Sequence, residues 1–294
     1  MHPAYEYIKA ALSAGKNVVT ANKAVIAAFY PELSETAKAN GVSLLFSASA
    51  GGGIPWLKNL ARAKEVDELL SLRGVMNGTT NYILDKMTGE NQDYGTALKE
   101  AQEAGFAEAD PSSDVEGLDT RRKLAVSLLA GFGIFADETS IPAFGITGIR
   151  PEDIAAAEKA GAVIKLVGFA EASGDKLSAY VVPVFVPAND LIATLHGADN
   201  AFSYTAKALG TQCFTGAGAG RYPTATNVIR DLKDLASAAG PVPAVPFREG
   251  RIENAGTFRF YVRENETAKI ITSSINEMRD AYEGKQGVFI ALLP

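Results

Sequence analysis

Cysteine and histidine are scarce in this 294-residue sequence, which has one cysteine, Cys213, and two histidines, His2 and His196. A single cysteine excludes an internal disulfide, and so few ligands exclude a zinc site built from cysteine and histidine. A cysteine without a disulfide partner is typical of a reducing compartment, so we expect the protein to be cytoplasmic.

The sequence also lacks a long apolar segment and a basic stretch. No apolar run reaches the roughly 18 to 20 residues of a membrane span, and the first residues, MHPAYEYIKAAL, lack the basic start and apolar centre of a signal peptide. The net charge is -6 and the pI is near 5.2, without a lysine- and arginine-rich segment to neutralise phosphates. These absences argue against membrane and nucleic-acid partners, and they favour a soluble protein that binds a small molecule.

The residues that are present predict a folded globular protein. Hydrophobic residues make up 47% of the sequence and charged residues 21%, which allows a large core in one large domain or two smaller ones. The first 55 residues alternate between helical and strand-like segments, an order typical of half of a parallel α/β sheet. The expected helices are 4–15 and 22–41, and the expected strands are 17–21 and 42–48.

The rest of the chain is expected to mix both element types. The predicted strands are 69–78, 176–187 and 211–218; the predicted helices are 79–89 with a threonine cap, 94–105, 108–132 with a polar beginning, and 224–240. Three prolines in 241–250 predict a linker, and the tail from 257 predicts a small strand-helix-strand unit.

Two glycine-rich segments suggest a cofactor site. The segment GAGAG, 216–220, is close to a dinucleotide fingerprint, but Arg221 stands where G-x-G-x-x-G needs its last glycine. Such a fingerprint also belongs at the first strand-helix turn of a Rossmann domain, whereas this segment lies late in the chain. It and SAGGGIP, 49–55, could equally be bare turns, because glycine serves wherever a chain bends tightly.

The segment EADPSSDVEGLDTRRK, 108–123, concentrates charge directly before an apolar run. Asp119 and Lys123 are four residues apart, so they share one helix face and can point into one cleft. An exposed ion pair is the alternative interpretation. A divalent-metal site is another, with Asp110 and Asp114 among its ligands, although the spacing of a calcium loop is missing.

Taken together, six segments resemble homoserine dehydrogenase, in the same order and nearly continuously from residue 4 to 238. They are KNVVTANKAVIA, FSASAGGGIP, VMNGTTNYIL, GFAEADPSSDVEGLDTRRKLAVS, HGADNAF and GAGAGRYPTAT. The resemblance implies reversible oxidation of L-homoserine to L-aspartate 4-semialdehyde with NAD or NADP. This reaction lies between the aspartate-derived pathways to threonine, methionine and isoleucine.

The resemblance also implies an α/β fold with an incomplete Rossmann-type nucleotide-binding domain and an α+β substrate and dimerisation domain. The nucleotide-binding domain is expected at 1–56 and 212–238 and the substrate domain at 57–211, with a linker and small C-terminal unit at 239–294 that could be a truncated ACT domain. A homodimer or homotetramer is expected.

By resemblance, Glu108, Asp114 and Asp119 bind the substrate, and Lys123 is the acid/base group, with Asp119 also counted as catalytic. Hydride loss from C4 of homoserine requires a base for the O4 proton, and a lysine serves near neutral pH only when its surroundings lower its pKa. Gly78 and Thr79 fit a substrate-side helix start, where free N–H groups favour a carboxylate. A simple threonine cap is the alternative there.

The same resemblance places the nucleotide against Thr20, Asn22, Lys23, Gly105 and Gly218. Asn22 and Lys23 follow an expected strand and therefore lie at the carboxyl edge of the sheet, where open α/β folds bind ligands. A helix cap is the alternative role for them.

Several features depart from the family pattern. The family carries G-x-G-x-x-G in an N-terminal stretch that this sequence does not contain, so we expect the chain to begin after it. That absent part also reads the ribose 2′ position, so the sequence does not choose between NAD and NADP. A non-catalytic or regulatory fragment that retains the substrate domain is the alternative function.

Two single-residue departures concern the Gly loop and the pocket. A glutamate that helps to hold a sodium or potassium ion in the family is Ser47 here, which leaves the carbonyls of Ala50, Gly52 and Ile54 as ligands of a weakened site. Phe106 replaces a tyrosine of many members, which removes one hydroxyl from the substrate pocket.

Overall fold

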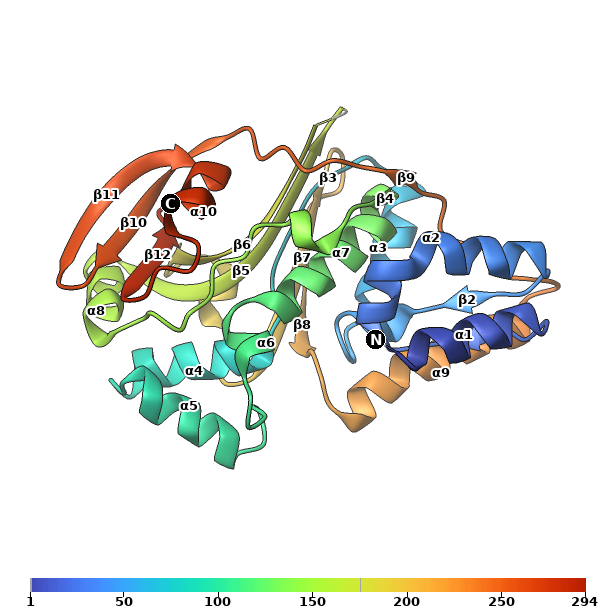
Figure 1. Cartoon of the computed structure of the whole chain (residues 1–294), viewed down its shortest axis with the longest axis horizontal. Coiled ribbons are helices and arrows are strands. Elements are labelled where there is room, and N and C mark those ends of the chain that lie inside the picture. Colours follow the sequence, from blue (N-terminus) through green and yellow to red (C-terminus); the bar gives the residue numbers. More distant parts are fainter. Residues whose placement is uncertain (1, 175) are drawn as a thin grey trace.

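An eight-stranded sheet forms the larger part of the computed structural model, which describes residues 2–174 and 176–294 (Figure 1). The strand order is β11-β10-β12-β6-β5-β3-β7-β8, and the described neighbours are antiparallel except for β12 and β6. The strands are β3 (Leu69–Val75), β5 (Ala162–Ser173), β6 (Lys176–Pro187), β7 (Asp199–Ala206), β8 (Gly210–Ala217), β10 (Thr257–Glu264), β11 (Thr267–Ser274) and β12 (Val288–Leu292).

Helices cover this sheet and carry most of the polar residues considered below. Helices α4, α7 and α8 contact β5, and α3 contacts both α7 and β7. The helices of this lobe are α3 (Trp56–Lys64), α4 (Gly78–Gly89), α5 (Tyr94–Glu103), α6 (Ser112–Val115), α7 (Leu118–Phe132), α8 (Pro151–Lys159) and α10 (Ile275–Tyr282). Short 3-10 turns are η1 (Ser47–Ser49), η2 (Glu138–Ser140) and η3 (Leu191–Thr194).

The smaller lobe contains a two-stranded parallel sheet, as expected for the start of the chain. Strand β1 (Val18–Val19) pairs in parallel with β2 (Leu44–Leu45). Helices α1 (Ala4–Ser13) and α2 (Lys23–Ala39) surround this pair, and α9 (Arg221–Ser237) contacts β1 (Figure 1). The helix that follows GAGAG therefore lies in the same lobe as the first residues of the chain.

The segment 108–132 is not the single helix that its sequence predicts. Gly117 adopts a left-handed conformation with φ of +79°, and the chain turns there between α6 and α7. A side chain at Gly117 would also meet Val181 Cγ1 at 3.2 Å, so the turn is both conformationally and sterically suited to glycine. Asp114, the acidic residue of α6, is thereby folded back beside the start of α7.

One prediction for the C-terminal part is corrected. The tail has one strand more than predicted, because β10 and β11 form a hairpin before α10 and β12. These strands extend the large sheet, since β12 pairs with β6 at Leu292 and Val184. The proline-rich segment is held against the protein: Tyr30 donates to the carbonyl of Val245 at 3.1 Å, and β9 (Arg248–Glu249) pairs with β4 (Ile134–Phe135).

One buried contact fixes α7 relative to its neighbours. Trp56 is fully buried at the start of α3, and its Nε1 donates to Ser127 Oγ at 2.8 Å. Its ring lies 5.3 Å from that of Phe202 in β7. Helix α7 is therefore held between α3 and the sheet. No helix in the part of the chain that the structure describes is long and apolar enough to cross a membrane.

Candidate active site

A buried ion pair lies in the first turns of α7. Lys123 Nζ is 2.7 Å from Asp119 Oδ2 and also donates to the carbonyl of Met76 at 2.6 Å. Lys23, at the start of α2, places its Nζ 3.1 Å from Asp119 Oδ1. Each carboxylate oxygen of Asp119 thus faces an ammonium group, one from each lobe.

The environment of Asp119 has opposing effects on its charge. Burial alone would raise the pKa of the carboxyl, but the ammonium groups of Lys123 and Lys23 and the amide of Asn77 outweigh it. The net result is a pKa well below the usual range of an aspartate. Asp119 is therefore ionised at every pH at which the protein is expected to be folded.

Asn77 joins two acidic residues of the site. Its Nδ2 donates to Asp114 Oδ1 at 2.7 Å and to Asp119 Oδ2 at 2.9 Å. Thr79 Oγ1 donates to Asp114 Oδ2 at 3.1 Å and to the carbonyl of Phe106 at 2.6 Å. Burial raises the pKa of Asp114, and the nearby charge of Asp119 adds to that effect. Sequence reasoning missed Asn77, although its place between a strand and Gly-Thr-Thr was a usable signal.

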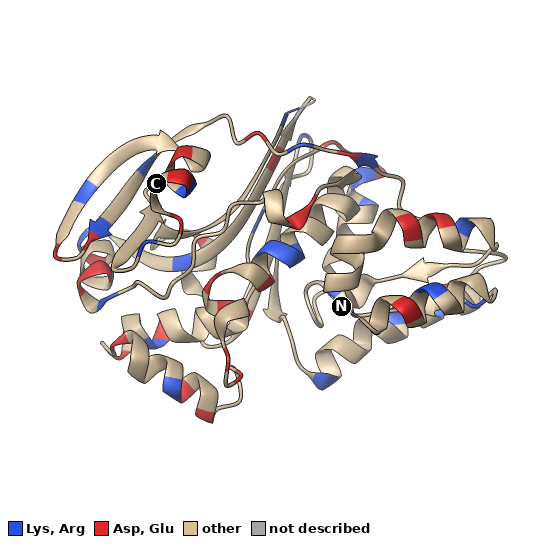
Figure 2. Cartoon of the chain, viewed as in Figure 1, with Lys and Arg blue, Asp and Glu red and all other residues tan. Residues whose placement is uncertain are grey.

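These groups border a cleft of about 450 Å³ between the two lobes. Acidic residues gather on α6 and on the loop that leads into it, beside the start of α7 (Figure 2). The lining residues are Ala21, Asn22, Lys23, Ala24, Glu108, Asp110, Ser113, Asp114, Asp119 and Arg122. Arg122 pairs with Glu138 at 3.3 Å. The cleft is therefore lined by exposed carboxylates and by buried Asp119, whereas Lys123 contacts Asp119 but is not among the lining residues.

The start of α4 lies next to this network. The cap of α4 is Asn77, whose Oδ1 accepts from the N–H of Thr80 at 2.9 Å, so the predicted threonine cap is wrong. The N–H groups of Gly78 and Thr79 are in the first turn, where helical geometry provides no internal acceptor. A Cβ atom at Gly78 would lie 2.6 Å from the carbonyl oxygen of Ala198, so a larger residue would displace the chain.

In the smaller lobe, the residues of the segment TANK, 20–23, have two roles. Thr20 Oγ1 accepts from the N–H of Asn22 at 3.1 Å, and Asn22 Oδ1 accepts from the N–H of Val25 at 3.1 Å. Asn22 is therefore the cap of α2, which agrees with the simpler of its two interpretations. Lys23 instead reaches across to Asp119, a contact that the sequence did not predict.

The two predicted cofactor glycines have different surroundings. Gly218 packs so tightly that a Cβ atom there would lie 2.2 Å from Asn200 Cγ. Gly52 packs against the backbone of Gly218. Gly105 follows α5 with φ of +76°, where an added Cβ would meet no atom within 4 Å. Thr20, Gly78, Thr79, Gly105 and Gly218 are not among the residues that line the cleft.

The residues predicted to bind a monovalent cation are close together but already bonded. Gly52 and Ile54 accept hydrogen bonds at their carbonyls from the side chain of Asn227, and Ser47 donates its N–H to Asp231. The structure does not support the divalent-metal interpretation either. Residues 2–174 and 176–294 contain no group of three or more histidine, cysteine or acidic residues placed to hold a metal ion.

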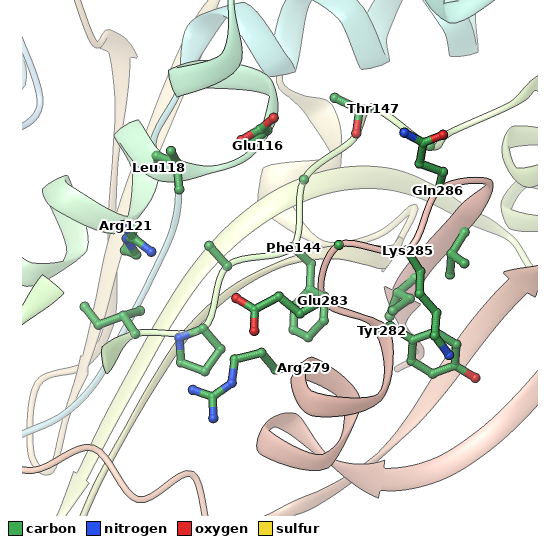
Figure 3. Close-up of a pocket in the computed structure, with 18 of the residues that line it drawn as sticks. Glu116, Leu118, Arg121, Phe144, Thr147, Arg279, Tyr282, Glu283, Lys285 and Gln286 are labelled. Atoms are coloured by element: carbon green, nitrogen blue, oxygen red, sulfur yellow. The ribbon is translucent and has the colours of Figure 1, made fainter. Parts of the chain in front are cut away.

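A second cavity, of about 610 Å³, lies on another side of α7 and contains no predicted site residue. Leu118 and Arg121 line it from α7, and Arg279 and Tyr282 line it from α10 (Figure 3). Its larger size does not make it the better candidate, because Asp119, which pairs with Lys123, lines the smaller cleft.

The comparison with protein families first defines the class of this protein. A family model described as "Homoserine dehydrogenase, NAD binding domain" matches residues 2–47, so the smaller lobe is that of a nicotinamide-dependent dehydrogenase. A second model, described as "Homoserine dehydrogenase", matches residues 55–232. The chain belongs to the homoserine dehydrogenase family.

Individual relatives agree with this assignment. The chain is 43% identical to the homoserine dehydrogenase of Bacillus subtilis over 227 residues, which are 77% of this chain and 52% of that protein. It is 40% identical to that of Synechocystis over 239 residues, 80% of this chain and 55% of that protein. The chain thus spans about half the length of the curated relatives it matches.

Solved structures show the same fold. A homoserine dehydrogenase from Thiobacillus denitrificans matches with a TM-score of 0.87 and 30% identity, over 100% of this chain and 80% of that one. A hyperthermophilic archaeal homoserine dehydrogenase mutant in complex with NADPH matches with a TM-score of 0.67 and 26% identity, over 80% of this chain and 68% of that one. The α/β fold expected from the sequence is confirmed.

Proposed function

We propose that this chain carries the substrate and acid/base part of a homoserine dehydrogenase, which reversibly oxidises L-homoserine to L-aspartate 4-semialdehyde with NAD or NADP. Membership of the family supports this proposal. The observation that carries it is the buried pair of Lys123 and Asp119, 2.7 Å apart beside a cleft between the two lobes.

The charges of the cleft suit the two ends of an amino acid. Asp119 already faces two ammonium groups, whereas Asp114 accepts only from neutral donors, and Glu108 is exposed at the edge. These carboxylates attract the substrate ammonium group. The first-turn N–H groups of Gly78 and Thr79 favour the substrate carboxylate, because a helix N-terminus attracts anions.

Lys123 is the residue placed to move the O4 proton. Its Nζ is held by Asp119 and by the carbonyl of Met76, so its position is fixed before the substrate arrives. The bound nicotinamide supplies the acceptor for the hydride that leaves C4. In oxidation the Lys123 ammonium first releases a proton to solvent, and the neutral amine then takes the O4 proton; in the reverse direction the ammonium donates that proton to O4.

The cofactor side is proposed to use Thr20, Asn22, Lys23, Gly105 and Gly218, with NADP and NAD both possible. The start of α2 and the tight glycine contacts before α9 fit a nucleotide, because they offer helix N-termini and close backbone approach. The 294 residues contain no G-x-G-x-x-G motif. We therefore expect them to bind the nicotinamide cofactor weakly on their own.

The remaining parts of the proposal concern organisation. Residues 1–56 and 212–238 form the nucleotide-binding part, 57–211 the substrate and dimerisation part, and 239–294 the linker and C-terminal unit. We further propose a cytoplasmic homodimer or homotetramer that acts in threonine, methionine and isoleucine synthesis.

Calorimetric titration of L-homoserine tests the substrate site without requiring the cofactor. We expect saturable binding to the wild-type chain that Asp119→Asn weakens at least about tenfold, a loss of about 1.4 kcal/mol. Glu68→Gln is the control, because Glu68 is an exposed carboxylate outside the cleft and should leave binding unchanged. Equal binding by Asp119→Asn and wild type would refute the proposed site.

Turnover separates the proposal from its alternative, a non-catalytic or regulatory fragment. The chain preceded by a G-x-G-x-x-G segment of the kind described above for the family should oxidise homoserine with NAD or NADP. Homoserine binding without turnover in that fusion would favour the alternative.

A further inference from the structure

The backbone carbonyls of the Gly loop meet side chains of α9 rather than open space. The loop turns through left-handed conformations, with φ of +90° at Gly51 and +55° at Gly52. Asn227 is fully buried on α9, and its Nδ2 donates to the carbonyls of Gly52 and, at 3.0 Å, of Ile54. These are two of the carbonyls that a monovalent cation would need.

The orientation of the Asn227 amide is fixed by a third contact. Arg230 Nη1 donates to Asn227 Oδ1 at 2.8 Å, so the amide oxygen faces the guanidinium and the NH2 group faces the loop. The same nitrogen of Arg230 is 3.3 Å from the carbonyl of Gly53. Hydrogen-bond donors therefore face the carbonyls of all three consecutive residues, Gly52, Gly53 and Ile54.

The acidic group nearest this loop is also paired. Asp231 is fully buried, and its Oδ2 accepts from the N–H of Ser47 at 2.9 Å. Its Oδ1 lies 3.1 Å from Lys58 Nζ, and Lys58 contacts Asp234 as well. The charge of Asp231 is thus balanced by an ammonium group that comes from α3.

These contacts do not fit a monovalent cation. A sodium or potassium ion binds through oxygen lone pairs, and here those of Gly52 and Ile54 point at the protons of the Asn227 amide. The guanidinium of Arg230, next to the carbonyl of Gly53, adds a positive charge beside the loop that would oppose a cation there.

We propose that in this chain Asn227, Arg230 and Lys58 hold the Gly loop in place of a monovalent cation. We name these three residues the α9 clasp, with Lys58 contributed by α3. The clasp also sets the GAGAG segment, because Gly53 donates to the carbonyl of Ala217 at 3.1 Å and Gly52 packs on Gly218. The clasp therefore holds the loop at the edge of the proposed nucleotide site without an ion. This structural role does not depend on the proposed activity.

Thermal unfolding in different salts tests the clasp. The Tm of the wild-type chain should be the same in sodium, potassium and choline chloride at equal ionic strength. Asn227→Ala should lower the Tm by several degrees in all three salts, because two buried carbonyls lose their donor. Asn227→Asp should lower it most in choline and recover in sodium or potassium, because a carboxylate facing those carbonyls recreates a cation ligand.

Asn81→Ala is the matched control. Asn81 is also fully buried, and its Nδ2 donates to the carbonyls of Gly197 at 2.9 Å and Asp199 at 3.2 Å. Its removal should lower the Tm equally in every salt. The proposal is overturned if the wild-type Tm rises saturably with sodium or potassium relative to choline, or if both Asn227 variants unfold at the wild-type temperature.

Discussion

Two buried lysines of this molecule have opposite electrostatic surroundings. Lys123 on α7 is 7% exposed and Lys165 on β5 is 3% exposed. Lys123 contacts the carboxylate of Asp119 at 2.7 Å, whereas Lys165 donates only to neutral oxygens, Asn81 Oδ1 at 2.8 Å and the Leu195 carbonyl at 2.7 Å. The two sites are equally buried but differ in whether a counter-charge is present.

The difference shows that burial alone does not identify a functional lysine. Burial lowers the pKa of Lys165 to about 8, with the more distant charge of Asp85 opposing the change only weakly. Lys165 connects α4 to the end of η3 through hydrogen bonds, and neither Lys165 nor Lys123 is itself among the residues that line the cleft. Lys123 belongs to a network that reaches the cleft through Asp119 and Lys23, which is why we assign the proton transfer to it.

The largest effect on stability should come from removing the counter-charge of Lys123. Asp119→Asn leaves the ammonium groups of Lys123 and Lys23 without their carboxylate, and breaking such a buried pair costs about 3 kcal/mol. Urea unfolding at neutral pH measures this loss. A loss below about 1 kcal/mol would mean that the network contributes no more than a surface pair does.

The same variant also gives a pH test. The pKa of Asp119 is lowered in the folded state, so its contribution is present above the unfolded-state pKa of about 3.9. It is lost as the pH falls through the lower folded-state value. The difference in the free energy of unfolding between wild type and Asp119→Asn should therefore be constant near neutral pH and shrink only in acid.

Lys165→Met should show a smaller effect that appears at alkaline pH. Between pH 8 and the ordinary lysine pKa of 10.5, Lys165 is neutral in the folded state but protonated in the unfolded state. The unfolded state then binds more protons, so wild-type stability should rise relative to Lys165→Met as pH increases from 8 to 9.5, on the order of 1 to 2 kcal/mol. Parallel pH profiles for the two proteins would show that Lys165 is not desolvated as described.

Asp114→Asn should give the smallest effect. Burial raises the pKa of Asp114 in the folded state, so the protonated side chain adds to the free energy of unfolding at low pH. This contribution is lost as the pH rises through the raised pKa. The variant should gain stability relative to wild type between pH 4 and 7, by less than about 1 kcal/mol because solvent screens the group. A relative loss of stability over that range would contradict the direction of the shift.

The sequence predicted the local part of this site better than its long-range part. The spacing of four put Asp119 and Lys123 on one helix face, and the structure has their charged atoms in contact. Spacing could not reveal that Lys23 reaches Asp119 or that Gly117 breaks the helix. Those features depend on how the two lobes pack and on a left-handed residue, neither of which leaves a periodic signal.

The fold was predicted in a similarly uneven way. The apolar strand β6 and the helix α4 follow their sequence patterns closely. Strands β5 and β7 were not predicted, because β5 contains Lys165 within its apolar run and β7 is short and mixed in polarity. Asn227 gave no signal either, since a single asparagine on an amphipathic helix is ordinarily a surface residue.

Homoserine turnover by the two lysine variants tests the central claim most directly, in the chain preceded by the family's G-x-G-x-x-G segment. Lys123→Ala should lower turnover at least about 100-fold with a modest change in cofactor affinity, as expected for a lost general acid/base. Lys165→Met should keep turnover within a few-fold of wild type at a temperature where circular dichroism shows all three proteins folded. Near-normal turnover in Lys123→Ala, or an equal loss in both variants, would contradict the account.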